Sequence, residues 1–125
     1  MARSPQSFPE AMLTLQESIR EHGYTIARVQ RVDVGLTAMG YKTDKYRVVF
    51  FGKGDEVDKL IAQHPELVAY LPLKVAIFAE GKETIVVGAN LKEVFGFFDL
   101  PDVDAAAARW DSDLRGIMDD VRWAE

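Results

Sequence analysis

The sequence contains no cysteine and only two histidines, His22 and His64. Without cysteine the chain cannot form disulfides, use a thiolate nucleophile or bind zinc and iron–sulfur clusters through sulfur. Each histidine lies at the end of an expected helix, where an imidazole interacts well with the helix dipole. No His-x-x-x-His or His-x-x-Glu pair occurs, so we predict neither a metal site nor a cofactor.

Basic residues are also scarce, with 15 Lys and Arg against 20 Asp and Glu and a net charge of -5. This balance argues against nucleic acid and anionic lipid as partners, since both require a basic surface. A local basic cluster could still bind a small anion. No apolar run approaches the length of a membrane span, and "MARSPQSFPE" has no apolar signal core. We therefore predict a cytoplasmic protein without a membrane partner.

Apolar residues make up 48% of the 125 residues, enough to bury the core of one domain spanning 1–125. The periodicity predicts four strands and several helices. "SFPEAMLTLQESIREHG" is expected to begin with a capping box, Ser7 with Glu10, and to end at Gly23; Asn90 and Glu93 form a second box. The expected strands are "YTIARVQRVDV", "YRVVFF" and the two arms of the hairpin "LKVAIFAEGKETIVVGA". The last helix covers about 102–122. Apolar residues recur along it at three- and four-residue steps and form one seam, namely Val103, Ala107, Trp110, Leu114, Ile117 and Val121.

The predicted fold class is α+β, a two-layer sandwich with one mostly antiparallel four-stranded sheet covered by helices. A helical segment separates "YRVVFF" from "LKVAIF". A right-handed crossover would make those two strands parallel if they share a sheet.

The turn Gly52-Lys53-Gly54 lies between a strand and a helix, the order found in phosphate-binding loops. Here the helix begins with Asp55, Glu56 and Asp58, whose carboxylates occupy the positive end of its dipole. We interpret Asp55 as the N-cap of this helix and the glycines as turn residues, with no phosphate bound.

Charged residues gather in the loop between the first two strands, where Gly35 and Gly40 add flexibility. Loops concentrate function, and this one could close over a small anion. The predicted ligand-binding residues are Arg31, Asp33, Lys42 and Tyr46.

Aromatic residues are abundant near the C-terminus, in "VFGFFDLP" and on the last helix. A short element can hardly bury all of them, and interfaces favour aromatic anchors. We predict a homodimer whose interface includes Phe95, Phe97, Phe98 and Trp110.

The central block "YRVVFFGKGDEVDKLIAQHPELVAYLPLKVAIFAEGKETIVVGA", with the preceding "SFPEAMLTLQESIREHGYTIARVQRVDV", resembles the bacterial and archaeal family called domain of unknown function 302. The resemblance covers about residues 7–90. It implies a small two-layer domain that pairs as a homodimer, and it implies no established activity. The family commonly has Asn-Pro after "FG", where this chain has Lys53-Gly54.

The sequence thus predicts a homodimeric module that binds a small molecule, such as a small anion, or a protein partner without catalysis. Two alternatives stay open. The chain could be a small enzyme with acid–base chemistry from Asp33, Lys42 and Tyr46, or an accessory subunit of a larger complex.

Overall fold

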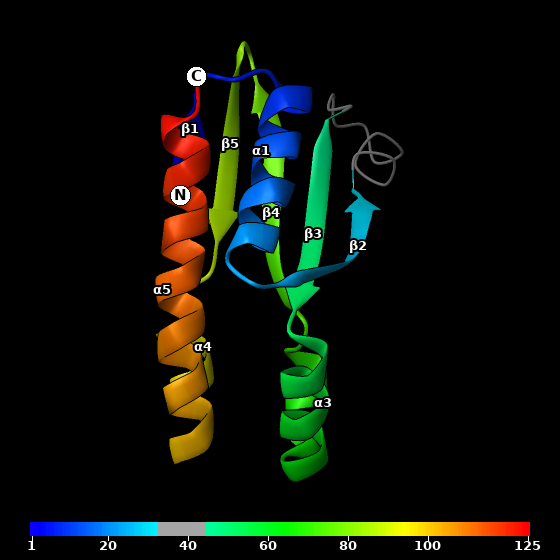
Figure 1. Ribbon diagram of the computed structural model, residues 1–125, viewed down its shortest axis with the longest axis vertical. Helices are drawn as coiled ribbons and strands as arrows, with labels where there is room; N and C mark the ends of the chain where they lie inside the picture. Colours follow the sequence, from blue (N-terminus) through cyan, green and yellow to red (C-terminus); the bar gives the residue numbers. More distant parts are fainter. Residues whose placement is uncertain (33–44) are drawn as a thin grey trace.

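A computed structural model describes residues 1–32 and 45–125 as one five-stranded sheet with helices (Figure 1). In chain order the elements are β1 (Ala2–Ser4), α1 (Phe8–Glu21), β2 (Thr25–Arg31), β3 (Tyr46–Gly52), α3 (Gly54–Gln63), the 3-10 helix η1 (Pro65–Ala69), β4 (Leu73–Glu80), β5 (Glu83–Gly88), α4 (Leu91–Gly96) and α5 (Pro101–Trp123). The strand order is β1-β5-β4-β3-β2, and every neighbouring pair is antiparallel. The predicted α+β two-layer class is confirmed.

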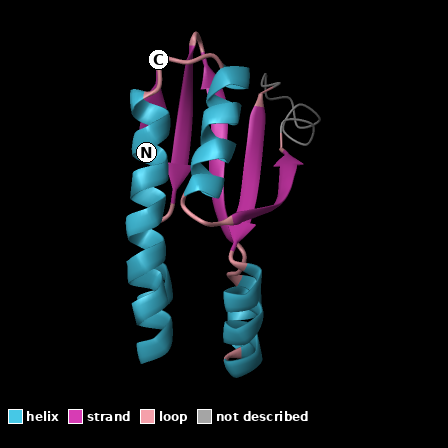
Figure 2. Cartoon of the chain, in the orientation of Figure 1, coloured by secondary structure: helices cyan, strands magenta, loops and turns pink. Residues whose placement is uncertain are grey.

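The helices are divided between one face of the sheet and one of its ends. Figure 2 shows α1 and the upper half of α5 in front of the strands, whereas α3 and the lower half of α5 extend beyond the end of the sheet. None of the described helices is long and apolar enough to cross a membrane.

Two features of the predicted topology were wrong. The sheet has five strands rather than four, because the three-residue β1 pairs with β5, and so short a segment carries no recognisable period. Strands β3 and β4 are antiparallel, with Tyr46 opposite Phe78. The crossover rule does not apply here, because α3 and η1 lie off the end of the sheet instead of crossing its face.

The two faces of the sheet differ in what covers them. Side chains alternate along a strand, and directly paired residues share a face. On the covered face, Val49, Val75 and Ile77 are completely or almost completely buried against α1 and α5. The other face, which we call the open face, faces away from α1 and α5. Its apolar residues are Tyr46, Val48, Phe50, Ala76, Phe78, Ile85 and Val87.

The helix ends agree only partly with the predicted caps. Asn90 accepts a hydrogen bond from the Glu93 backbone N–H at 3.2 Å, as predicted. Ser7 is the N-cap of α1, but its hydroxyl donates to the Glu10 carboxylate at 2.7 Å, so the reciprocal box is absent. Gly23 follows α1 with a φ of 87°, a conformation that favours glycine. Lys53, and not Asp55, is the N-cap of α3.

Helix α5 confirms the predicted apolar seam. Its bounds lie within one residue of the prediction, and the six seam residues are all buried, namely Val103, Ala107, Trp110, Leu114, Ile117 and Val121. Ser18 of α1 donates to the Asp120 carboxylate at 2.6 Å, which ties the two helices together.

The coverage of the sheet can be tested with two valines that face each other across β2 and β3. Val49 is fully buried, whereas its partner Val29 is 40% exposed at the edge of the sheet. We expect Val49→Ala to lower the free energy of unfolding by about 2 kcal/mol, because it leaves a cavity. The control Val29→Ala should cost less than about 1 kcal/mol in the same urea titration. Both valines lie on the same face, so equal losses would contradict a core that is buried at β3 and exposed at the edge strand β2.

Candidate functional site

The predicted ligand-binding residues do not form one cluster in the described chain. Asp33 and Lys42 lie outside the described residues. Arg31 pairs with Arg47 on the covered face, where the Arg47 guanidinium lies 5.6 Å from the centre of the Phe8 ring. Tyr46 lies on the open face and stacks on Phe78 with ring centres 5.1 Å apart. Arg31 and Tyr46 therefore point to opposite sides of the sheet.

The predicted interface aromatics lie at different depths. Phe95 and Trp110 are 1% and 2% exposed and belong to the chain's own core, where their rings contact each other edge to face. Phe98 is partly buried against the same core. Phe97 is 86% exposed. Of the four residues, Phe97 therefore presents the most surface to a partner.

A cavity of about 640 Å³ opens at the end of the sheet where β2 and β4 begin and β3 ends. We call it the Arg28–Lys74 cavity, after the two charged residues that border it. Its lining comes from three parts of the chain. These are Phe50 on the open face, the segment from η1 to the start of β4, and helix α4. Its volume is within the range of small-molecule sites.

The walls of this cavity are apolar and aromatic. Leu91, Val94 and Phe95 of α4 line it on one side, and Tyr70 lies on another. Tyr70 is half exposed, and its ring contacts Phe98 edge to face at 5.2 Å. A ring or an alkyl chain would therefore be surrounded by carbon atoms on several sides.

Both charges at this cavity are positive. Arg28 lies next to a β-bulge in β2, and its guanidinium carbon lies over the Phe50 ring, 4.3 Å from the ring centre. Lys74 pairs with Phe50 from the neighbouring strand and is exposed. No carboxylate is among the described lining residues, although the chain as a whole is acidic. The arrangement thus combines an apolar pocket with an anion-attracting rim.

A second hollow, of about 580 Å³, lies between α3 and α5. Three of its polar residues, Glu56, Asp102 and Arg109, are paired. Glu56 accepts a hydrogen bond from the Trp110 indole N–H at 2.7 Å and forms an ion pair with Arg109. Asp102 lies 2.9 Å from His64, and this hydrogen bond lowers the pKa of Asp102. These contacts brace α3 against α5.

Tyr24 belongs to the same polar region. Its hydroxyl donates to the Asp113 carboxylate at 2.6 Å, and Lys53 lies 5.1 Å from the centre of its ring. Burial, and then this hydrogen bond, raise the pKa of Tyr24 well above its ordinary value. The phenol therefore keeps its proton and serves as a donor rather than as a base.

The histidines make structural contacts, as predicted. His22 Nδ1 lies 2.8 Å from the Ser18 carbonyl oxygen, and His64 pairs with Asp102. Within residues 1–32 and 45–125, no three metal-binding side chains are grouped together.

Comparison with known proteins identifies the family. A family model described as "Domain of unknown function DUF302" matches residues 2–121. The chain belongs to this DUF302 family. The fold is similar to the crystal structure of an uncharacterized conserved DUF302 protein from Bacillus stearothermophilus, with a TM-score of 0.84 and 18% identity over 97% of this chain and 95% of that one. No curated protein matched.

The family assignment extends beyond the predicted 7–90 and includes β1 and most of α5. It brings no activity, so the candidate site rests on geometry alone. Sequence reasoning missed the Arg28–Lys74 cavity because its two cations are far apart in the chain. One signal was present: in "YRVVFF" every second residue, Tyr46, Val48 and Phe50, is apolar, which indicates a second apolar face.

The role of Tyr24 can be tested by Tyr24→Phe, which removes only the hydroxyl. We expect a loss of about 1–2 kcal/mol in the free energy of unfolding near pH 7, because the bond to a carboxylate is lost. A tyrosine whose pKa is raised by folding adds to the free energy of unfolding at pH values below its pKa in the unfolded chain, which is near 10. This contribution is lost as the pH rises above that value. The wild type should therefore lose more stability than Tyr24→Phe between about pH 10 and 12.

The measurement is the urea midpoint at each pH, and Tyr70→Phe is the control because that residue is half exposed. Identical pH profiles for the wild type and Tyr24→Phe would contradict the assigned hydrogen bond.

Proposed function

We propose that this protein is a non-catalytic binding module whose Arg28–Lys74 cavity takes a small amphipathic anion, a carboxylate with an aromatic or alkyl body. The observation that carries this proposal is the coincidence of an apolar cavity of about 640 Å³ with two cations and no described carboxylate at its rim. Burial of the apolar body supplies affinity, and the cations select the charged group.

The charge pattern supports an anion rather than a neutral ligand. Glu and Asp outnumber Lys and Arg in this chain, so a site bordered only by cations departs from the average surface. The Arg28 guanidinium carbon lies over the Phe50 ring, 4.3 Å from its centre, and a guanidinium carries a planar fork of N–H donors. Such a fork matches the two oxygens of a carboxylate.

The absence of catalysis is supported by the composition of the lining. Among its described residues, Tyr70 and Lys74 can exchange protons, but no carboxylate or imidazole accompanies them. General acid–base catalysis requires a positioned partner with a matched pKa. The composition of the lining therefore favours binding of a ligand over chemical conversion of a substrate.

Isothermal titration calorimetry with 4-phenylbutyrate and decanoate tests this function. We expect the carboxylate to bind more tightly than its neutral analogue, 4-phenylbutanamide. Arg28→Met, which keeps an apolar stem, should weaken binding of the carboxylate roughly tenfold and leave binding of the amide unchanged. Lys74→Met should act in the same direction.

Lys82→Met is the matched control, because Lys82 is exposed in the β4–β5 turn and does not border the cavity. Equal affinity for acid and amide, or no effect of Arg28→Met, would contradict the charge selection. No binding of either carboxylate would overturn the assigned ligand class.

A further inference from the structure

We propose that the ligand of the Arg28–Lys74 cavity carries two carboxylates, so that its class is a dicarboxylate with an apolar body. This inference rests on the proposed function and adds the number of charged groups that the ligand presents. Three features of the site point to this class: the position of the two cations relative to each other, their lack of described counter-ions, and the apolar walls beside them. A single carboxylate would neutralise only one of the two cations.

Arg28 and Lys74 lie in one row across the sheet, on either side of Phe50. Arg28 is opposite Phe50 in the β2–β3 register, and Lys74 is opposite Phe50 in the β3–β4 register. Directly paired residues share a face, so all three side chains leave the open face at the same level of the sheet. Two strand spacings separate the Cα atoms of the two cations, about 10 Å. The row therefore presents two positive charges to one edge of the cavity.

The β-bulge in β2 brings Arg28 into this row. An unbroken register would place Arg28 opposite Val49, on the covered face. The register shift between Ile26 and Arg28 places the arginine opposite Phe50 instead, on the open face. Bulges often occur next to active sites, where they re-aim a side chain. The bulge thus turns an arginine of the edge strand toward the cavity.

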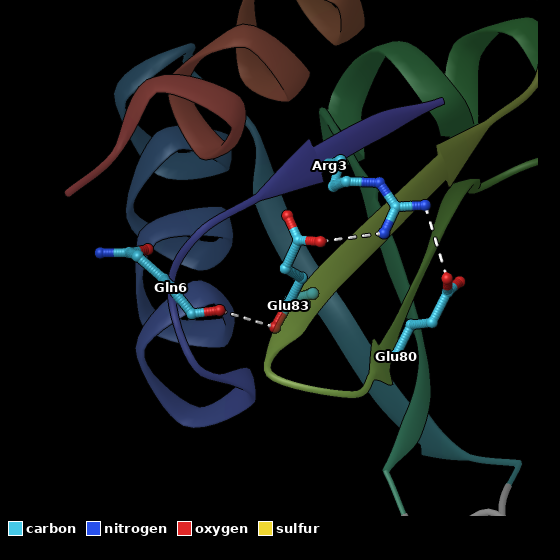
Figure 3. Close-up of polar contacts among 5 residues, drawn as sticks. Arg3, Gln6, Glu80 and Glu83 are labelled. Atoms are coloured by element: carbon cyan, nitrogen blue, oxygen red, sulfur yellow. Dashed lines mark hydrogen bonds and ion pairs between the residues drawn. The ribbon is translucent and has the colours of Figure 1, made fainter.

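Neither cation of the row has a carboxylate partner within residues 1–32 and 45–125. Several other arginines of the chain do have such partners. Arg3 lies 3.5 Å from Glu80 and 3.3 Å from Glu83 (Figure 3). The further arginines in ion pairs are Arg109, Arg115 and Arg122. At these places the counter-ions come from the chain itself, whereas at the cavity a ligand can supply them.

The carboxylates of the sheet lie at its opposite end. Glu80 and Glu83 are the only carboxylates in the described strands, and both belong to the β4–β5 hairpin. Lys74 and Glu80 are six residues apart on β4, which corresponds to about 20 Å. The positive charges of Arg28 and Lys74 are much closer to each other and repel each other. A ligand with two negative charges removes this repulsion.

A succinate that carries one apolar substituent fits this arrangement. The guanidinium of Arg28 offers a fork that matches both oxygens of one carboxylate, whereas the ammonium of Lys74 is a point charge that can attract the other carboxylate. The apolar substituent then enters the part of the cavity lined by α4 and Tyr70. The second charge distinguishes such a ligand from a simple fatty or aryl-alkyl acid.

Isothermal titration calorimetry with benzylsuccinate and 4-phenylbutyrate tests the number of charges. The second compound is benzylsuccinate without one carboxylate, so the two ligands differ in that group alone. Near pH 8 both carboxyl groups of benzylsuccinate are ionised, and we expect its better enantiomer to bind roughly fivefold more tightly at low salt. In about 1 M salt the advantage should fall to within about twofold, because both cations are exposed and are screened.

Variants of the two cations test which residues recognise the second carboxylate. Lys74→Met and Arg28→Met should each reduce the advantage of benzylsuccinate to within about twofold, because one cation then faces two carboxylates. Lys74→Arg keeps the charge and should keep the advantage. Lys82→Met is the control away from the cavity and should also leave the advantage unchanged. A monoamide of benzylsuccinate keeps the size of the diacid and should bind like 4-phenylbutyrate.

Circular dichroism on each variant confirms folding. Binding of 4-phenylbutyrate with no gain for benzylsuccinate would overturn the dicarboxylate class and leave the proposed function in place. Absence of binding by both compounds would overturn the dicarboxylate class and the proposed function together. An advantage that persists in both Lys74→Met and Arg28→Met would overturn the assignment of the second carboxylate to this row.

Discussion

The sheet is apolar on both faces, but the described helices cover only one of them, and the rest of the structure depends on this difference. Strands β3, β4 and β5 carry apolar side chains on both faces, but α1 and α5 pack on one face alone. Each covered valine or isoleucine contributes roughly 1.5–3 kcal/mol through removal from water, and this gain defines the core. The open face gains only part of that contribution within one chain, because its residues shield one another and no described helix shields them.

The same lack of described helices over the open face produces the cavity. Helix α3 and η1 leave the end of the sheet instead of returning across the open face, and α4 leaves the same end with α5. Their inner sides meet in a small aromatic cluster around Phe95 and Trp110. Glu56 holds α3 against Trp110 and Arg109, and His64 holds it against Asp102. A hollow remains where this group of helices meets the open face, and Arg28 and Lys74 are the charged residues that border it.

Local patterns predicted the elements well where the pattern was long. The six-residue seam of α5 and the hairpin of β4 and β5 follow from spacing alone, and both agree with the structure. Prediction failed where the deciding contact was distant. The three residues of β1 become a strand only because β5 offers an edge, and Phe95 and Trp110 become core residues only because α4 folds back on α5. Lys53 replaces Asp55 as N-cap because α3 begins one residue before Asp55, at Gly54.

By itself the sequence determined the helices, most of the strands and the two-layer class, because periodicity, caps and turns act between residues close in the chain. It also determined that the sheet would be apolar on both faces, as the alternating residues of β3 indicate. Only the tertiary structure decided which face is covered, since that depends on where α1 and α5 dock. It alone brought Arg28 and Lys74 to one cavity and separated Arg31 from Tyr46, because strand pairing and register set which distant side chains share a face.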